Sequence, residues 1–497
     1  MSGFLTPEER RRLRPAETAT PATPIPTQVV ASDEYVPPAQ SARQREVQVR
    51  LAELGGALAA RQGLSRRAFF AGAAGMASAF LVMNEVYGSL FDASPAEAAT
   101  PEMAAERARS LADQFVFDGH THFLRDDTRL KGFASFRQLF ADLGWNPAMP
   151  KRQQTVEDLK YDSYVKEMFL DSDTKIAILS SAPSEVPADW FLTNEMMAAA
   201  RAKLNAKAGA KRLLAHAIFT PGSDGWLESL DRALALKPDS MKGYTIGDNT
   251  HKDLSKPWRM DDEKVTYRAY ERFQKAGIRN VCVHKGLFPP SVEERFPKLR
   301  PYVDVSDVGK AAKDWPGLNF VIYHAGYRQV GGFRGPVGEA EDAWAEVEKT
   351  GRCEWVTDLA EIPGRLGVTN VYADLGQIFA NTIVANPRLA AFVLGTLVKG
   401  LGAERVVWGS DALWSGSPQW QIEGLRRLEI PEEMRTKYGF APLGAADGPV
   451  KNAILGGTSA RLYNVSTKPV PDKLATLKDE YQRSGGERSN RRYGFVV

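Results

Sequence analysis

Two histidines close a short apolar run near residue 120. Residues 116–122 read Val-Phe-Asp-Gly-His-Thr-His. Side chains alternate along an extended strand, so Asp118, His120 and His122 share one face. Imidazole is the commonest metal ligand in proteins, and the chain has only six histidines. The pair therefore indicates one edge of a metal site, the alternative being two hydrogen-bonded rings in an ordinary strand.

Other ligand-type side chains also end apolar runs. His284, His324 and Asp411 each follow such a run and precede a polar loop. Short apolar or β-branched runs occur eight times along the chain. Helical patterns such as residues 262–276 and 339–349 lie between them. The expected strands are residues 116–122, 175–180, 213–219, 240–245, 280–284, 319–324, 370–374 and 405–411.

Eight alternations of strand and helix predict a (β/α)8 TIM barrel, with long mouth loops and a C-terminal helical extension. An open, doubly wound sheet is the fallback, but no Gly-rich phosphate loop follows the first strand. In a parallel barrel the carboxyl ends of the strands share one rim. Imidazoles and a carboxylate at one rim predict a divalent metal site of the zinc type with room for a water, whose pKa the metal would lower.

Residues 117–465 resemble the amidohydrolase superfamily, within its second family, which includes aminocarboxymuconate-semialdehyde decarboxylase. The resemblance is carried by His-Thr-His at 120–122, Val-His-Lys-Gly at 283–286, Tyr-His-Ala-Gly at 323–326 and Trp-Gly-Ser-Asp at 408–411. It implies four metal ligands and a catalytic acid/base. The implied ligands are His120, His122, His284 and Asp411; His324 is the implied acid/base, and Asp411 is a second candidate for proton transfer. The chain departs from the family at Gly456-Gly457-Thr458, where Gly-Asn is common.

Two basic residues have more than one interpretation. Lys242, on the fourth expected strand, stands where binuclear members of the superfamily carry a carboxylated lysine that bridges two metals. It could instead bind a substrate carboxylate or form an ion pair with Asp248 or Asp374. Arg328 could clamp an anionic substrate or lie on the surface. One or two metal ions, Zn²⁺ or alternatively Mn²⁺, are therefore expected.

The remaining rim residues have weaker signals. His216 lies inside the third strand and is expected to be a hydrogen-bonded barrel residue, whereas His251 lies in a polar loop and is expected to be solvated. Three aromatic residues, Phe288, Trp414 and Trp420, could wall an apolar pocket or simply pack. The long connections at residues 123–174 and 327–368 are lid candidates at the barrel mouth.

The ends of the chain lie outside the barrel, which we place at residues 110–465. Residues 1–64 are rich in Pro, Thr, Ala and Arg and are expected to be disordered, and residues 466–497 form a C-terminal tail. At residues 65–98, Ser-Arg-Arg precedes an uncharged Ala/Gly-rich run, and Ala-Glu-Ala stands at 96–98. This resembles a twin-arginine export signal with a cleavage site and predicts a periplasmic enzyme; a buried or anchoring helix is the alternative.

The net charge and the number of cysteines exclude some classes of function. The net charge is +3, and the first 67 residues alone hold ten arginines against seven acids, so no basic face for nucleic acid is expected. Two cysteines are too few for a disulfide framework. We expect a metal-dependent hydrolase of a C–N or C–O bond in a small molecule. The alternatives are a non-oxidative decarboxylase and a non-catalytic exported binding protein. The expected partners are the substrate and the export machinery, with a homo-oligomer left open.

Overall fold

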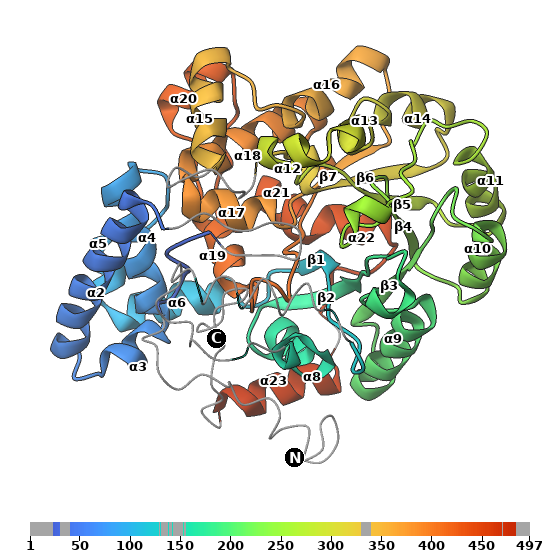
Figure 1. Cartoon of the computed structure of the whole chain (residues 1–497). Coiled ribbons are helices and arrows are strands. Elements are labelled where there is room, and N and C mark those ends of the chain that lie inside the picture. Colours follow the sequence, from blue (N-terminus) through green and yellow to red (C-terminus); the bar gives the residue numbers. More distant parts are fainter. Residues whose placement is uncertain are drawn as a thin grey trace.

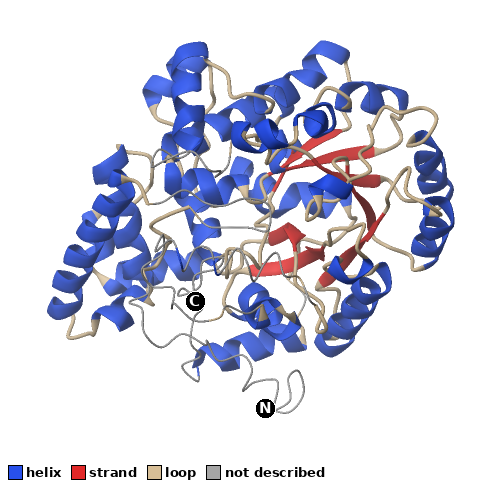
Figure 2. Ribbon diagram, viewed as in Figure 1, coloured by secondary structure: helices blue, strands red, loops and turns tan. Residues whose placement is uncertain are grey.

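The computed structural model describes residues 23–29, 40–128, 156–329, 339–469 and 471–483, together with single residues 130, 138, 142 and 153. Within these residues, eight strands form one sheet in sequential order, and every neighbouring pair is parallel. The strands are β1 (Val116–Thr121), β2 (Thr174–Leu179), β3 (Leu213–Ile218), β4 (Ser240–Tyr244), β5 (Asn280–His284), β6 (Asn319–Tyr323), β7 (Val371–Asp374) and β8 (Val406–Val407). Helices surround the sheet (Figures 1 and 2). The predicted TIM barrel is confirmed.

The barrel closes between its first and last strands. The amide of Gly119 on β1 donates to Trp408 O at 2.9 Å, just after β8, and Thr121 forms a parallel bridge with Ala412. Because β8 itself has only two residues, these contacts beyond the strand complete the seam. They also bring Asp411 beside the end of β1.

Helices between the strands cover the outside of the barrel. The longer ones are α9 (Asn194–Ala208), α10 (Trp226–Ala235), α11 (Tyr267–Lys275), α14 (Val308–Asp314), α16 (Val356–Leu366), α17 (Ile378–Ala385) and α18 (Pro387–Leu401), and α19 (Gln419–Arg427) follows β8. Shorter or peripheral helices are α8 (Tyr161–Val165), α12 (Pro290–Arg295), α13 (Arg300–Val303), α15 (Glu339–Thr350), α20 (Glu432–Tyr438), α21 (Pro449–Asn452), α22 (Thr458–Leu462) and α23 (Lys473–Arg483). The predicted helices at 262–276 and 339–349 correspond to α11 and α15.

The N-terminal region differs from its prediction. Part of the segment predicted to be disordered forms helix α2 (Ala42–Arg61), which has a Ser41–Gln44 capping box and buries Val47, Leu51 and Leu58. That part of the prediction was wrong because the apolar side chains of α2 find a partner, α4 (Ala73–Tyr87). With α3 (Arg66–Phe70), α5 (Pro95–Ala99) and α6 (Pro101–Ser110), these helices form a group at one side of the barrel, blue in Figure 1.

The two lid candidates fall partly outside the described residues, at 129–155 apart from the single residues and at 330–338. The described ends of both connections are structured. The first includes α8, which continues into a π-helical turn (Lys166–Leu170), and the second includes α15 and α16. In the C-terminal tail, α23 contacts α9 and buries Leu474 and Leu477. None of the helices in the described part of the chain is long and apolar enough to cross a membrane.

Candidate metal centre

Three ligand atoms converge at the seam between β1 and the loop after β8. His120 Nε2 and His122 Nε2 each lie 3.3 Å from the same carboxylate oxygen, Asp411 Oδ1. All three side chains are at most 4% exposed. The alternation of β1 points both imidazoles to one side, as the sequence predicts, and the seam supplies the carboxylate.

The backbone around Asp411 is held in place by β1. The Asp411 amide donates to His120 O at 2.9 Å, and the Asp118 carboxylate accepts from the amides of Ser410 (3.0 Å) and His120 (3.1 Å). Asp411 has φ of 57°, in the left-handed region that non-glycine residues rarely adopt. Such a conformation costs about 1–3 kcal/mol and persists where surrounding contacts enforce it, as they do here.

A second carboxylate, that of Asp374, orients the His120 ring through the nitrogen that faces away from Asp411. His120 Nδ1 lies 2.9 Å from Asp374 Oδ1, at the end of β7. A carboxylate accepts a hydrogen bond, so the proton of His120 is on Nδ1 and the lone pair of Nε2 faces Asp411. Gly376 and Gly409 leave room for this pair, since a Cβ at either position would lie 2.4 Å from His120 Nδ1 or 2.1 Å from Asp374 Oδ2, respectively.

His324 and His284 complete the cluster. The His324 ring centroid lies 4.9 Å from that of His120 and 4.7 Å from that of His284. His324 Nδ1 donates to Gly376 O at 2.9 Å, which leaves Nε2 as its basic nitrogen. The ring of His284 stacks on Tyr244, with centroids 4.8 Å apart. The structure thus brings together all five rim residues that the sequence singled out.

Burial sets the charge of this cluster. Burial and the nearby Lys242 ammonium hold the pKa of His120 and His122 well below the usual value, so both rings are neutral. Burial also raises the pKa of Asp118 and of Asp374 to about 7. A bound cation would favour the ionised form of these carboxyl groups.

The donor set fits a divalent metal ion. Two atom groups, His120–His122–Asp411 and His120–His324–Asp374, each have ligand atoms within 4.8 Å of one another. Neutral imidazole nitrogens and a carboxylate oxygen are borderline donors of the kind that Zn²⁺ and Mn²⁺ accept. A carboxylate behind a ligating histidine is the usual arrangement around such an ion.

Lys242 lies beneath this cluster, fully buried. Its Nζ lies 3.3 Å from the centroid of the Tyr323 ring, which in turn lies 3.9 Å from the ring of His120. The Tyr323 hydroxyl donates to Gly119 O at 2.6 Å and accepts from His216 Nε2 at 2.7 Å. His216 is thus a hydrogen-bonded barrel residue, as predicted, whereas the bridging and substrate-binding roles of Lys242 stay predictions.

Arg328 is occupied by two carboxylates. Its guanidinium pairs with Glu293 and, at 2.5 Å, with Glu354, and it also lies 5.2 Å from the Trp355 ring. His251, expected to be solvated, is half-buried and pairs with Asp189 at 2.7 Å, because loops after β2 and β4 meet there.

One of the three aromatic residues borders the centre directly. Trp414 stacks on His122, with ring centroids 5.5 Å apart and planes 23° apart, and so forms one wall of the centre. Trp420 and Phe288 are buried.

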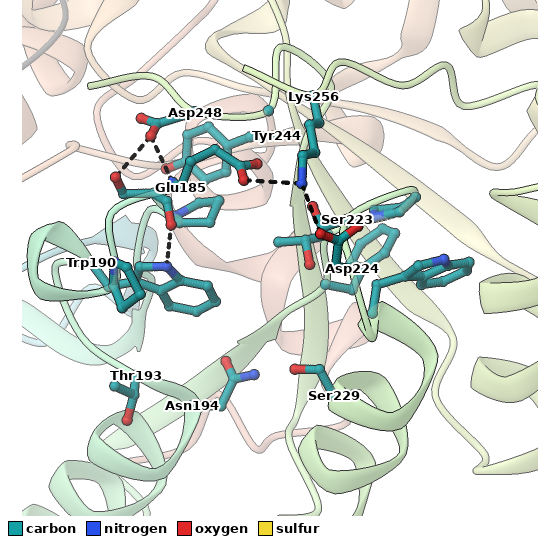
Figure 3. Close-up of a pocket in the computed structure, with 18 of the residues that line it drawn as sticks. Glu185, Trp190, Thr193, Asn194, Ser223, Asp224, Ser229, Tyr244, Asp248 and Lys256 are labelled. Atoms are coloured by element: carbon teal, nitrogen blue, oxygen red, sulfur yellow. Dashed lines mark hydrogen bonds and ion pairs between the residues drawn. The ribbon is translucent and has the colours of Figure 1, made fainter. Parts of the chain in front are cut away.

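A pocket of about 480 Å³ adjoins the centre at the carboxyl ends of β2, β3 and β4 (Figure 3). Its aromatic lining comprises Trp190, Phe219, Trp226, Tyr244 and Trp258. Tyr244 is shared, because its ring also stacks on His284. At the rim, Lys256 pairs with Glu185 at 3.5 Å and Asp224 at 3.7 Å.

Comparison with known sequences identifies the family. The model of the amidohydrolase family matches residues 117–465, from β1 to the end of the barrel. The chain belongs to the amidohydrolase family. The match covers β1 to β8 and every ligand-type residue of the centre. A search of curated protein sequences gives no match.

Several solved structures resemble the chain at low sequence identity. 5-Carboxyvanillate decarboxylase of Sphingomonas paucimobilis is 15% identical, covering 71% of this chain and 100% of its own, with a TM-score of 0.39. 2,6-Dihydroxybenzoate decarboxylase of Rhizobium has the same identity and TM-score, with 71% and 99% covered. A zinc-bound amidohydrolase of Burkholderia multivorans is also 15% identical, with a TM-score of 0.39. The match covers 71% of this chain and 100% of that one. At these scores the likeness does not bear on substrate or reaction.

The sequence interpretation missed the role of Asp374. This residue ends β7 as Asp411 follows β8, so the rule that selected the other rim residues also points to it. Its function as a partner of His120 depends on the two glycines that let the side chains meet, which spacing alone does not reveal.

Proposed function

We propose that this amidohydrolase is a metal-dependent hydrolase that cleaves a C–N or C–O bond of a small organic molecule. The observation that carries the proposal is the convergence of His120 Nε2 and His122 Nε2 on one oxygen of Asp411. A divalent ion bound by these atoms would lower the pKa of a water and supply a nucleophile near neutral pH. Zn²⁺ is the proposed ion and Mn²⁺ the alternative, on the basis of the N/O donor set.

The histidines of the chain have separate parts in this proposal. Asp374 holds His120 in the tautomer that presents Nε2. His324, fixed through Nδ1 by Gly376 O, accepts a proton at Nε2 and returns it to the leaving group. Trp414 and Tyr244 cover His122 and His284, respectively, and limit the access of bulk water.

The charges near the centre favour hydrolysis over decarboxylation. A decarboxylase needs a fixed cation for the carboxylate of its substrate. Arg328, the arginine candidate from the sequence, is neutralised by Glu293 and Glu354. The other candidate, Lys242, is fully buried, with its Nζ 3.3 Å from the centroid of the Tyr323 ring. The pocket beside the centre is lined by four carboxylates, those of Glu185, Glu195, Asp224 and Asp248, against two cations, Arg232 and Lys256. An anionic group gains little there, whereas a neutral ring gains contact with the aromatic walls.

The test is a metal and substrate assay. Elemental analysis of the purified protein should give about one to two divalent ions per chain, and a His120→Ala/His122→Ala variant should lose them. The zinc and manganese forms are then screened against amides, esters, lactones and aromatic carboxylates. Stoichiometric metal in the double variant would reject the centre. Release of CO₂ from a carboxylate, with no hydrolysis, would establish the decarboxylase instead.

We also propose export by the twin-arginine route. Arg66 and Arg67 are exposed at the start of α3, where Ser65 caps the helix. Their position on the surface supports recognition of the folded protein. Replacing both arginines by lysine should leave the chain in the cytoplasm, as measured by fractionation; unchanged export would show that the pair has no such role.

A further inference from the structure

The connection after α4 is paired with the end of α19. The amide of Asp92 donates to Arg427 O at 2.8 Å, and the amide of Glu429 donates to Leu90 O at 2.8 Å, on either side of an antiparallel bridge between Phe91 and Leu428. Asn84 on α4 fixes the same turn, since its Oδ1 accepts from the amides of Leu90 and Phe91, both at 2.9 Å. This segment is therefore tied both to its own helix and to the barrel.

An enclosed ion pair lies where the sequence predicts a cleavage site. Glu97, between Ala96 and Ala98, binds the Arg427 guanidinium through both carboxylate oxygens, at 2.6 and 3.0 Å. The two side chains are 9% and 3% exposed, and Ala98 is buried. Without residues up to 98, the Arg427 charge would keep its contact with Glu423, at 3.5 Å, but would lose its best-aligned partner.

The apolar side of α4 belongs to the same core as the barrel. Phe80 and Met83 from α4, and Phe91 after it, share one buried cluster with Ile422 and other residues of α19. The rings of Phe80 and Phe91 lie 4.8 Å apart, and Arg427 lies 5.7 Å from the centre of the Phe80 ring. Removal of α4 would expose this apolar surface of α19 to water.

Helix α19 leads to the metal centre. Gln421 in its first turn donates to Ser415 Oγ at 2.8 Å and approaches Ser410 O at 3.5 Å, on both sides of Asp411. The N-terminal helices are thus linked, through α19, to the loop that presents the Asp411 carboxylate.

We propose that residues 73–99 are no removable leader but stay in the mature enzyme, where they brace α19 and the Asp411 loop. The export machinery would then recognise the exposed arginine pair at 66–67 and transport the chain without cleavage after Ala98. This inference rests on the packing of the N-terminal helices and stands independently of the reaction catalysed.

The first test is the mass of the folded protein. The full-length chain is produced in a bacterial host that has a twin-arginine pathway, and the periplasmic and cytoplasmic fractions are analysed by intact mass spectrometry. Every soluble, metal-containing species should include residues 73–99. A soluble, metal-containing species that begins at residue 99 would overturn the proposal.

If all of the protein stays in the cytoplasm, the export proposal is rejected, but the role of residues 73–99 is still open. Variants of the chain test that role separately. A chain that starts at residue 100 should be insoluble, or should melt more than about 10 °C below the full-length chain and bind less zinc. In the full-length chain, Glu97→Gln should lower the melting temperature by several degrees and open residues 88–99 to chymotrypsin. Glu53→Gln, at an exposed position on α2, is the matched control. A truncated chain with full-length stability and zinc content, or a Glu97→Gln variant identical to the control, would overturn the proposal.

Discussion

The Asp374 carboxylate fixes the tautomer of His120, and so decides which nitrogen faces the other ligands. The 2.9 Å contact is enclosed, since both side chains are at most 1% exposed. Water therefore cannot replace the carboxylate as the acceptor. In the proposed centre, the strength of metal binding through His120 would then depend on the carboxylate that accepts from its other ring nitrogen.

Asp374→Asn is expected to weaken metal binding about 10- to 100-fold, because the amide keeps the shape of the side chain but lacks its charge. Zinc affinity measured by competition with a chelator checks this. Asp113→Asn, at an exposed position, is the control and should bind zinc like the wild type. Equal affinities in the two variants would show that Asp374 does not support the centre.

His324→Ala is expected to lower kcat by roughly two to four orders of magnitude, the usual effect of losing a general acid/base. The metal at His120, His122 and Asp411 should remain bound, as measured by elemental analysis. His251→Ala, at a histidine paired with Asp189, should keep its turnover. Loss of half of a two-ion complement in His324→Ala would instead make His324 a ligand and favour Lys242 as a bridge.

At the level of elements, the turns after β6, β7 and β8 shape the centre together with the ends of β1 and β5. His324, Gln377 and Asp411, in these turns, have φ of 60°, 58° and 57°. Each turn aims a side chain or carbonyl inward at the cluster. The positions of His324, Gly376 O and Asp411 therefore depend on strained backbone that the barrel holds in place.

Gly409→Ala should disrupt the centre, because the added Cβ would lie 2.1 Å from Asp374 Oδ2 and 2.8 Å from His120 Cβ. We expect loss of zinc and a melting temperature several degrees lower, measured by elemental analysis and calorimetry. Gly364→Ala in α16 is the control, since nothing lies within 4 Å of its added Cβ. It should leave zinc binding intact and raise stability by up to about 1 kcal/mol. Normal zinc content in Gly409→Ala would contradict the packing argument.

The strand pattern and the placement of the rim residues were predictable from the sequence, because the buried strands are apolar runs and the candidate ligands stand at or just after the ends of four of them. β5, for example, was predicted at residues 280–284 and is Asn280–His284. The eighth strand was predicted to run to Asp411, but β8 ends at Val407 and a loop carries the chain to the ligand. Asp411 still lies beside the end of β1, because its amide donates to His120 O.

The pairing of Arg328 was not predictable. Its two partners, Glu293 and Glu354, come from different connections on either side of β6, and no spacing rule joins them to it.

The burial of α4 was also ambiguous, since an uncharged Ala/Gly-rich run suits both an export signal and a core helix. Only the tertiary contacts distinguish a packed helix from an exposed one.

At the level of the whole molecule, a charged cluster joins the start of β2 to α19 and the C-terminal helix. Asp173 accepts from Arg426 at 2.7 Å and from Gln419 at 3.0 Å, and Lys478 of α23 lies 3.3 Å away. Burial alone would raise the pKa of Asp173, but Arg426 and Lys478 outweigh it and hold the pKa below its usual value. This cluster attaches parts that are distant in the sequence.

Asp173 is expected to make the protein sensitive to acid. The pKa of Asp173 is lower in the folded state than in the unfolded state. Its contribution to the free energy of unfolding is therefore complete above about pH 4 and is lost as the pH falls through the folded-state pKa. Asp173→Asn should cost roughly 1–3 kcal/mol at pH 7, and its difference from the wild type should shrink towards pH 2. Calorimetry of the EDTA-treated proteins measures this difference in stability at each pH without a contribution from metal loss. Asp231→Asn, which breaks an exposed pair with Arg272, should cost less than about 1 kcal/mol. A constant difference across this pH range would contradict the assignment.

The seam between β1 and the segment after β8 also sets the order in which the enzyme can be assembled. His120 and His122 leave the ribosome early, whereas Asp411 is made only after seven further strands. A nascent chain therefore has two histidines without their carboxylate until almost the whole barrel has been synthesised. Because a domain of this kind folds as a unit, the proposed metal site is complete only when this seam closes. Transport of the folded chain would then deliver an enzyme already charged with the metal of the compartment in which it was made.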